Sequence, residues 1–222
     1  MEQDFFQNIF WPDIGQALLD TLAMLSGSLL LTLILGIALG VLLFLTDRGQ
    51  ISESLLANRL LGVFVNILRS IPFVILLIVM IPLTLWMMGT SLGVAGAIPP
   101  LVAGAAPFYA RLVEAALREI PRSTIEAAQA MGASRLQIVG KILLPEALPG
   151  LVSGATVTAI ALVSFTAMAG VVGAGGLGDL AIRYGYQRFQ ADVMLVTVVL
   201  LVLLVQCIQW CGDWLARRLD HR

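Results

Sequence analysis

Charge is scarce in this sequence of 222 residues. Only 12% of the side chains are charged, about half the fraction found in soluble domains, whereas 59% are apolar. The formal net charge is −1, so there is no basic excess of the kind that draws a protein to nucleic acid. We therefore expect membrane lipid, and no nucleic acid, as a partner.

Residues that commonly carry catalysis or bind metals are also scarce. The one histidine, His221, lies in a polar tail, so no Ser/His/Asp or Cys/His arrangement is available. Cys207 and Cys211 are four residues apart with no histidine beside them, which favours packed thiols over a zinc site. The chain also has no G-x-x-x-x-G-K-[ST] phosphate loop. We expect no ATPase site, no enzymatic activity, and no cofactor or metal in this chain.

The few charges leave four long stretches without any, and each is long enough to cross a hydrocarbon core of about 30 Å. The longest is about twice that length and divides at a turn near residues 88–93. Continuous apolar runs predict helices, because barrel strands would alternate in polarity. The fold expected is an all-α integral membrane protein. Five transmembrane helices are predicted near 17–46, 60–87, 92–117, 148–172 and 192–214.

Basic residues orient these helices in the membrane. Nine lie in the segments after the first, third and fifth spans, and two, Arg183 and Arg188, lie on the other side. Because Lys and Arg concentrate in cytoplasmic segments, the C-terminal tail (215–222) is predicted to be cytoplasmic and the N-terminal tail (1–16) external. The acidic N-terminus lacks the basic region of a cleavable signal peptide.

A polar island at 121–147 separates the third and fourth spans on the predicted cytoplasmic side. Ser123 and Glu126 fit a capping box, and Gly132 stands where a helix C-cap favours positive φ. Ser134 then opens a second helix that runs to Pro145. A connection this long exceeds the usual ~2–8 residues, which favours a contact with a soluble partner. The alternative is that Glu126 only caps and Gly132 only turns.

The island resembles a known motif. Glu126-Ala127-Ala128, then Gly132, then Ile142-Leu143-Leu144-Pro145 resembles the Glu-Ala-Ala (EAA) loop of bacterial ABC importer permeases. Four further segments make most of the chain similar to the permeases of methionine ABC importers. They are Arg69-Ser70-Ile71-Pro72-Phe73, Gly104-Ala105-Ala106-Pro107-Phe108, Leu144-Pro145-Glu146-Ala147-Leu148-Pro149-Gly150 and Gly173-Ala174-Gly175-Gly176-Leu177-Gly178.

This resemblance implies a type I importer permease in the bacterial inner membrane. It implies a homodimeric pore, two cytoplasmic subunits that bind ATP, and an external binding protein that delivers D- or L-methionine. The island would be the coupling helix that docks on the ATPase. The residues implied in coupling are Glu126, Ala127, Ala128, Met131, Gly132, Ala133 and Pro145.

A G-x-G-x-x-G pattern at 173–178 follows an apolar span rather than a strand, so we reject a dinucleotide site and expect a flexible outer turn. Near it, Met168 is a candidate for the outer gate. Ser164 and Thr166 on the same span, with Ser70, are candidates for the pathway of the solute.

Other features within the spans concern packing. Arg69 and Arg111 are interpreted as snorkelling to the cytoplasmic interface. Prolines in the second and third spans are expected to kink or open those helices. Gly36 and Gly40 form a small-xxx-small face for close contact, within the chain or across a dimer.

Two alternatives stay open. One is an importer of another small solute, such as another amino acid, a quaternary amine or a phosphonate. The other is a self-contained channel or proton-coupled transporter, which is disfavoured because no acidic residue lies deep in a predicted span.

Overall fold

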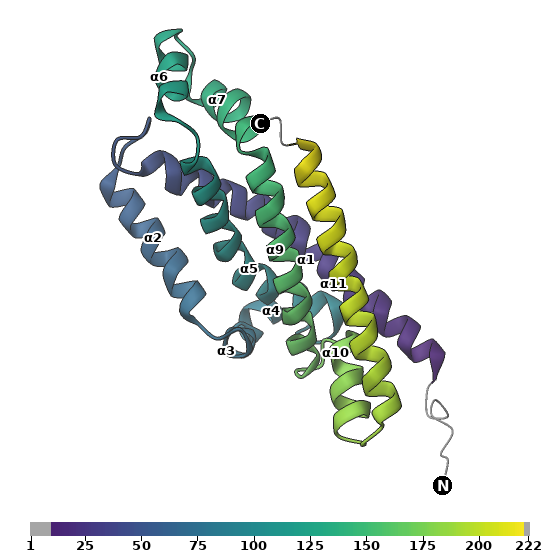
Figure 1. Cartoon of the computed structure of the whole chain (residues 1–222). Coiled ribbons are helices and arrows are strands. Elements are labelled where there is room, and N and C mark those ends of the chain that lie inside the picture. The colour runs from purple at the N-terminus through teal and green to yellow at the C-terminus, as the bar shows by residue number, and fades with distance from the viewer. Residues whose placement is uncertain (1–9, 220–222) are drawn as a thin grey trace.

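A computed structural model describes residues 10–219, and within them the chain is helical with no strands. The helices form an elongated bundle in which α1 runs obliquely behind α5 and α9 (Figure 1). The start of α1 and the end of α11 lie at opposite ends of the bundle, and α6 lies at the same end as the end of α11 (Figure 1). The elements are α1 (Trp11–Thr46), α2 (Leu55–Ser70), α3 (Phe73–Val79), α4 (Ile81–Met88), α5 (Gly93–Arg118), α6 (Arg122–Ala130), α7 (Arg135–Ile138), η1 (Val139–Leu143), α8 (Leu144–Glu146), α9 (Leu148–Gly170), α10 (Gly176–Leu180), η2 (Ala181–Tyr186) and α11 (Ala191–Leu219).

Four of these helices, α1, α5, α9 and α11, are each long and apolar enough to cross a membrane. They confirm four of the predicted spans, with shifted ends. α1 begins at Trp11, because Pro12 and Asp13 suit the first turn of a helix, so the expected tail at 1–16 is partly helical. α11 continues to Leu219, past the predicted end at 214. Residues 1–9 of the expected N-terminal tail, and His221, lie outside the described residues.

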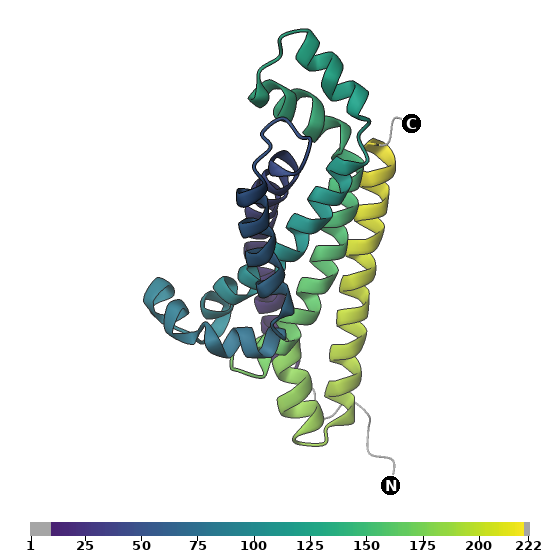
Figure 2. The ribbon, with the colours of Figure 1, turned by 90° about the vertical axis from the view of Figure 1, so that its left-hand side faces the viewer.

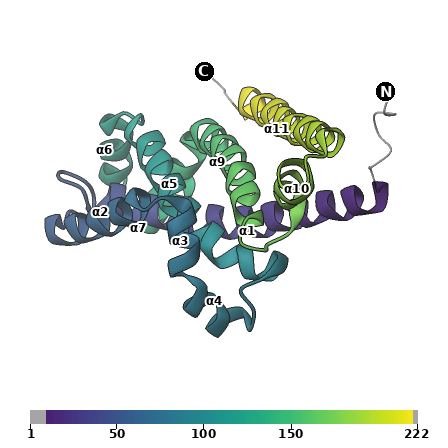
Figure 3. The same cartoon turned by 90° about the horizontal axis from the view of Figure 1, so that it is seen from below.

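The second predicted span, 60–87, is wrong as a single helix. α2 and α3 meet at a bend of 103°, and α4 follows as a separate helix. Ile71 has ψ of 123° at the end of α2, as expected for a residue that precedes a proline, here Pro72. As a result α3 and α4 project sideways from the bundle (Figure 2), on the side opposite α11 (Figure 3). α5, by contrast, continues unbroken through its three prolines.

α1 and α5 pack most closely, along the small-xxx-small face predicted from the sequence. A Cβ added to Gly36 would lie 2.6 Å from the ring of Tyr109. One added to Gly40 would lie 2.6 Å from the carbonyl oxygen of Ala110, which is backbone and cannot rotate away. The contact is thus made within the chain. The Tyr109 hydroxyl also donates a hydrogen bond of 3.1 Å to the Leu151 carbonyl, which ties α5 to α9.

The glycine-rich segment after α9 is packed rather than open. Gly175 and Gly176 have positive φ and lead into α10, and a Cβ on Gly178 would lie 2.3 Å from the Cα of Ala167. The Leu177 amide donates to the Thr21 hydroxyl of α1 at 2.9 Å in a buried position. The expectation of a flexible outer turn is therefore wrong for 176–178, because these glycines let α10 pack tightly against α1 and α9.

The α1–α5 contact predicts that Gly40→Leu destabilises the protein, because its side chain meets backbone rather than a movable group. Overpacking of this kind costs about 1–3 kcal/mol or more. The variant should show reduced yield and a lower melting temperature in detergent, followed by tryptophan fluorescence. Gly15→Leu on the same helix is the control, since nothing lies within 4 Å of a Cβ there. Equal effects of the two variants would contradict this packing.

Candidate coupling and transport sites

The island begins with α6 and turns at Gly132. The Gly132 amide donates to the Gln129 carbonyl at 2.9 Å, and the Ala133 amide donates to the Ala128 carbonyl at 3.1 Å. With Gly132 at φ 79°, these two bonds make a Schellman motif, which satisfies the last carbonyls of α6. The predicted glycine turn between two helices is confirmed.

The predicted capping box at the start of α6 is wrong. The capping box of the island lies instead at the start of α7, thirteen residues before the end of the island. α6 follows Pro121, which has ψ of 134° and no side-chain cap, so Ser123 falls inside the first turn. The capping box joins Ser134 and Gln137 at the start of α7, with the Ser134 amide donating to the Gln137 side chain at 2.8 Å. It fixes the direction in which the chain leaves the turn.

Exposure separates the predicted coupling residues into two groups. Glu126, Ala127, Met131, Gly132 and Pro145 are exposed, whereas Ala133 is half-buried. Ala128 is buried with Ile125 against the rest of the protein, so it anchors α6 and leaves no alanine surface at that position.

Two large apolar side chains mark the outer surface of the island. Met131 is 82% exposed and Leu136 is 85% exposed, one on each side of Gly132. Both side chains are therefore available for contact, and the Schellman turn fixes the backbone between them. Leu136 was not among the coupling residues predicted from the sequence. Its position in the first turn of the helix that Ser134 opens could have indicated it.

The α1–α2 loop supports α6 from the side. The Arg122 guanidinium donates to the Gly49 carbonyl at 2.5 Å, and the Gly49 amide donates to Glu53 at 2.8 Å. A polar cavity of about 240 Å³ lies between this loop and α6, and Arg122 and Glu126 are among its lining residues.

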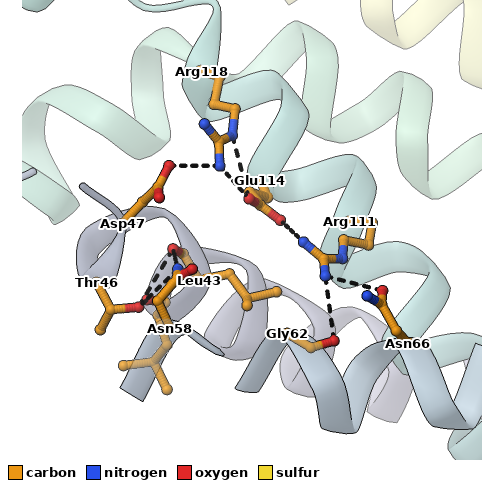
Figure 4. Close-up of polar contacts among 10 residues, drawn as sticks. Leu43, Thr46, Asp47, Asn58, Gly62, Asn66, Arg111, Glu114 and Arg118 are labelled. Atoms are coloured by element: carbon orange, nitrogen blue, oxygen red, sulfur yellow. Dashed lines mark hydrogen bonds and ion pairs between the residues drawn. The ribbon is translucent and has the colours of Figure 1, made fainter. Parts of the chain in front are cut away.

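An ionic network at the end of α5 joins the same loop to the bundle (Figure 4). The Glu114 carboxylate, 7% exposed, pairs with Arg111 at 2.7 Å and with Arg118 at 2.6 Å. Arg118 also reaches Asp47 in the α1–α2 loop at 2.7 Å. The Arg111 guanidinium donates to the Asn66 side chain of α2 at 3.0 Å. A buried carboxylate thus holds α5, α2 and the loop together.

This network adds partners that were not predicted. Arg111 was expected to snorkel to the interface, and the structure shows its guanidinium held by Glu114 and Asn66. Glu114 was missed as a site residue, although i, i+3 and i, i+4 spacing to two arginines was present in the sequence. It lies in α5 only one turn before Arg118, so the helix still has no acidic residue deep in the span.

Arg69 is also misplaced by the sequence interpretation. It lies one residue before the end of α2, fourteen residues from Leu55, which is about 21 Å along the helix axis. Because α2 starts beside the island, Arg69 lies far from the end of the bundle that carries the island, and its guanidinium faces the ring of Phe108 at 6.0 Å.

The predicted pathway residues do not form one group. Ser164 and Met168 line the same apolar cavity of about 510 Å³ between α9 and α11. Thr166 is buried and donates to the Val163 carbonyl of its own helix at 2.7 Å, so it faces away from that cavity. Ser70 lies on α2 and donates to the Asn66 carbonyl at 2.8 Å. The structure brings Ser164 and Met168 together and separates the other two.

Metal chemistry has little support in the part of the chain that the structure describes. Residues 10–219 contain no group of three or more His, Cys, Asp and Glu side chains that could hold a metal ion. Cys207 and Cys211 are free thiols on α11, and both are exposed rather than packed as predicted.

Residues 33–222 match the family described as binding-protein-dependent transport system inner membrane component. The chain belongs to this family. It is therefore a membrane-embedded permease subunit of a bacterial ABC importer, with the helical fold expected from the sequence.

Two curated relatives show how far the similarity extends. The chain is 55% identical over 188 residues to the probable D-methionine transport system permease protein MetI of Vibrio cholerae, covering 85% of this chain and 84% of that protein. It is 46% identical over 222 residues to the methionine import system permease protein MetP of Bacillus subtilis, covering all of both chains.

Solved structures agree with the sequence relatives. A chain of the MetNI methionine ABC transporter, solved in inward-facing conformations, matches with a TM-score of 0.94 and 50% identity, over 96% of this chain and all of that one. An amino acid ABC transporter solved with histidines matches with a TM-score of 0.75 at 14% identity, which shows a shared fold.

The network predicts a graded response to loss of its acids. Glu114→Gln should destabilise by about 3 kcal/mol, because it leaves two arginines without their buried partner. Asp47→Asn should cost about 1 kcal/mol or less, because the Asp47–Arg118 pair is more exposed. Melting temperatures in detergent measure both, and an effect of Asp47→Asn as large as that of Glu114→Gln would contradict this ranking.

Proposed function

We propose that this chain is the permease subunit of an ATP-driven importer of methionine. The observation that carries the proposal is the end-to-end similarity, at 46% identity, to a methionine import permease. The structural match to a chain of a methionine ABC transporter, at 50% identity, also supports it. In the proposed assembly, two copies of this chain form the pore, and an external binding protein delivers D- or L-methionine.

Energy would come from two separate cytoplasmic ATPase subunits. The chain contains no phosphate loop, so it lacks the residues that cradle ATP phosphates. ATP would be bound and hydrolysed by the partner subunits, and the chain would act without enzymatic activity or a cofactor of its own.

The island supplies the proposed contact with these subunits. Met131 and Leu136 are exposed apolar side chains on either side of a rigid turn. Glu126 adds a negative charge on α6. The positive-inside bias supports a cytoplasmic position for the island, the α1–α2 loop and the C-terminal tail. The N-terminal tail would then lie outside the inner membrane.

The transport cycle would be one of alternating access. Closure of the ATPase pair would displace α6, and the Schellman turn and the capping box would keep α6 and α7 moving together. Arg122 and the Glu114 network would pass this displacement to the α1–α2 loop and to α5. The two copies would then rock against each other and expose the pathway to the outside.

The cargo is tested by uptake into proteoliposomes that contain the permease, its ATPase and its binding protein. We expect ATP-dependent uptake of labelled methionine that excess unlabelled D- or L-methionine suppresses. Choline, a phosphonate and histidine serve as competitors of the alternative classes. Suppression by one of these, with none by methionine, would overturn the proposed cargo.

Coupling predicts that Met131→Asp prevents assembly with the ATPase while the permease itself folds. Met131 is exposed, so the substitution changes the docking surface at little cost to packing. A charge buried in an interface without a partner weakens binding by about 2–5 kcal/mol, or roughly 30-fold or more. Size-exclusion chromatography of the permease with its ATPase measures this directly.

Phe189→Asp is the matched control for this variant. Phe189 is 88% exposed and lies just after η2, in the hairpin at the opposite end of the bundle from the island. Its positive φ of 57° is one that Asp adopts readily. It should retain the ATPase, and normal assembly of Met131→Asp would argue against docking through the island.

A further inference from the structure

A second cavity lies where the bend between α2 and α3 meets α5 and α9. Its volume is about 330 Å³, within the range of roughly 300–1,000 Å³ that small-molecule sites occupy. The lining is apolar except at one point, and it includes Gly104 and Phe108 from α5, Phe165 from α9, and Phe73 from α3. None of the residues expected to form the solute pathway lines it.

Arg69 is the exception to this apolar lining. Among the described residues, it is the charged one that lines the cavity. The two other arginines near this face, Arg111 and Arg118, both pair with Glu114. Within residues 10–219 no carboxylate lies within 4.0 Å of the Arg69 guanidinium. Arg69 is exposed rather than buried, so its guanidinium is accessible to a ligand that brings a negative charge.

The opposite wall is aromatic. The Phe73 and Phe165 rings are stacked, with centroids 4.4 Å apart and planes 8° from parallel, and Phe108 lies under the Arg69 guanidinium. Stacked rings offer a flat apolar surface, and a thioether sulfur makes favourable contacts with aromatic rings. The cavity therefore combines one carboxylate receptor with one surface for an apolar or sulfur-containing side chain.

We infer that this cavity is a solute-binding site of the permease for an amino acid with an apolar side chain. Arg69 receives the α-carboxylate, in the bidentate geometry that guanidinium groups favour. The Phe73–Phe165 pair receives the side chain, and the α-ammonium stays toward the open side of the cavity. The inference rests on the proposed function, and it assigns to the permease a site separate from that of the binding protein.

The bend of 103° explains why such a site exists here. In a straight helix, Phe73 would continue the direction of α2 and could not turn toward Phe165 on α9. Because Pro72 breaks the helix, α3 leaves sideways and the cavity opens at the corner next to Arg69. The broken second span is thus the feature that builds the site.

Arg69→Gln tests the inference in proteoliposomes that contain the complete transporter. Uptake of labelled L-methionine and ATP hydrolysis are measured together, at saturating methionine-loaded binding protein, so that affinity for the binding protein does not enter. We expect uptake per ATP to fall about tenfold or more, because a hydrogen-bonded charge partner is lost. Arg69→Lys should restore part of it, since Lys keeps the charge without the fork.

Arg59→Gln is the matched control, since Arg59 is an exposed arginine at the other end of the same helix. It should leave uptake per ATP unchanged. If Arg69→Gln does not assemble, Ala161→Leu decides instead: it narrows the same cavity from α9 without altering a charge, and it should also lower uptake per ATP.

The outcomes separate this inference from the proposed function. Absence of methionine uptake by the unmodified transporter would refute the proposed function itself. Methionine uptake by the unmodified transporter, with uptake per ATP unchanged in Arg69→Gln or in Ala161→Leu, would overturn the site alone. A dependence of Arg69→Gln on anionic lipid, without any change in uptake per ATP, would assign Arg69 to a lipid phosphate and also overturn it.

Discussion

The close approach of α1 and α5 is the contact on which the other sites depend. At Gly40 the two helices are so near that a single added carbon would meet the Ala110 carbonyl. In lipid, where apolar side chains gain little by leaving the solvent, such small-residue contacts are a main source of helix association. α5 is thereby held in the bundle by its backbone, and it carries residues of both the ionic network and the cavity at the α2–α3 bend.

This arrangement links the two ends of the proposed mechanism through one helix. Glu114 and Arg118 in the last turns of α5 hold the loop that supports α6, whereas Gly104 and Phe108 lie about two to four turns earlier, beside Arg69. In the proposed cycle, a displacement at the island passes through the α1–α2 loop to the end of α5, and this continuous helix reaches the solute cavity.

Much of the fold was predictable because lipid imposes strict limits on the sequence. Stretches without charge located four continuous spans, and the position of Gly132 located the turn of the island. The expected kink in the second span is confirmed at Pro72, whereas the prolines in α5, which have the same local chemistry, do not break that helix. Which proline bends a helix depends on its neighbours in space, here the packing of Phe73 on Phe165.

In the candidate sites, too, features set by local sequence were predictable, whereas features set by contacts between distant segments were not. Exposure of Met131 follows from a local turn and could be predicted, whereas the burial of Ala128 depends on where α6 rests. The pairs of Glu114 with Arg111 and Arg118 were visible as helical spacing, but the Asp47 contact joins segments 71 residues apart and needs the folded chain. Arg69 was misplaced because its depth depends on where α2 begins and ends.

We propose that this pore is driven by a separate ATPase. The most direct measurement is to purify the chain from its native membrane and to identify and quantify what accompanies it. We expect an ATP-binding subunit in equal amounts, retained through purification in mild detergent. Consistent purification of the chain alone, with transport activity intact and independent of ATP, would contradict it.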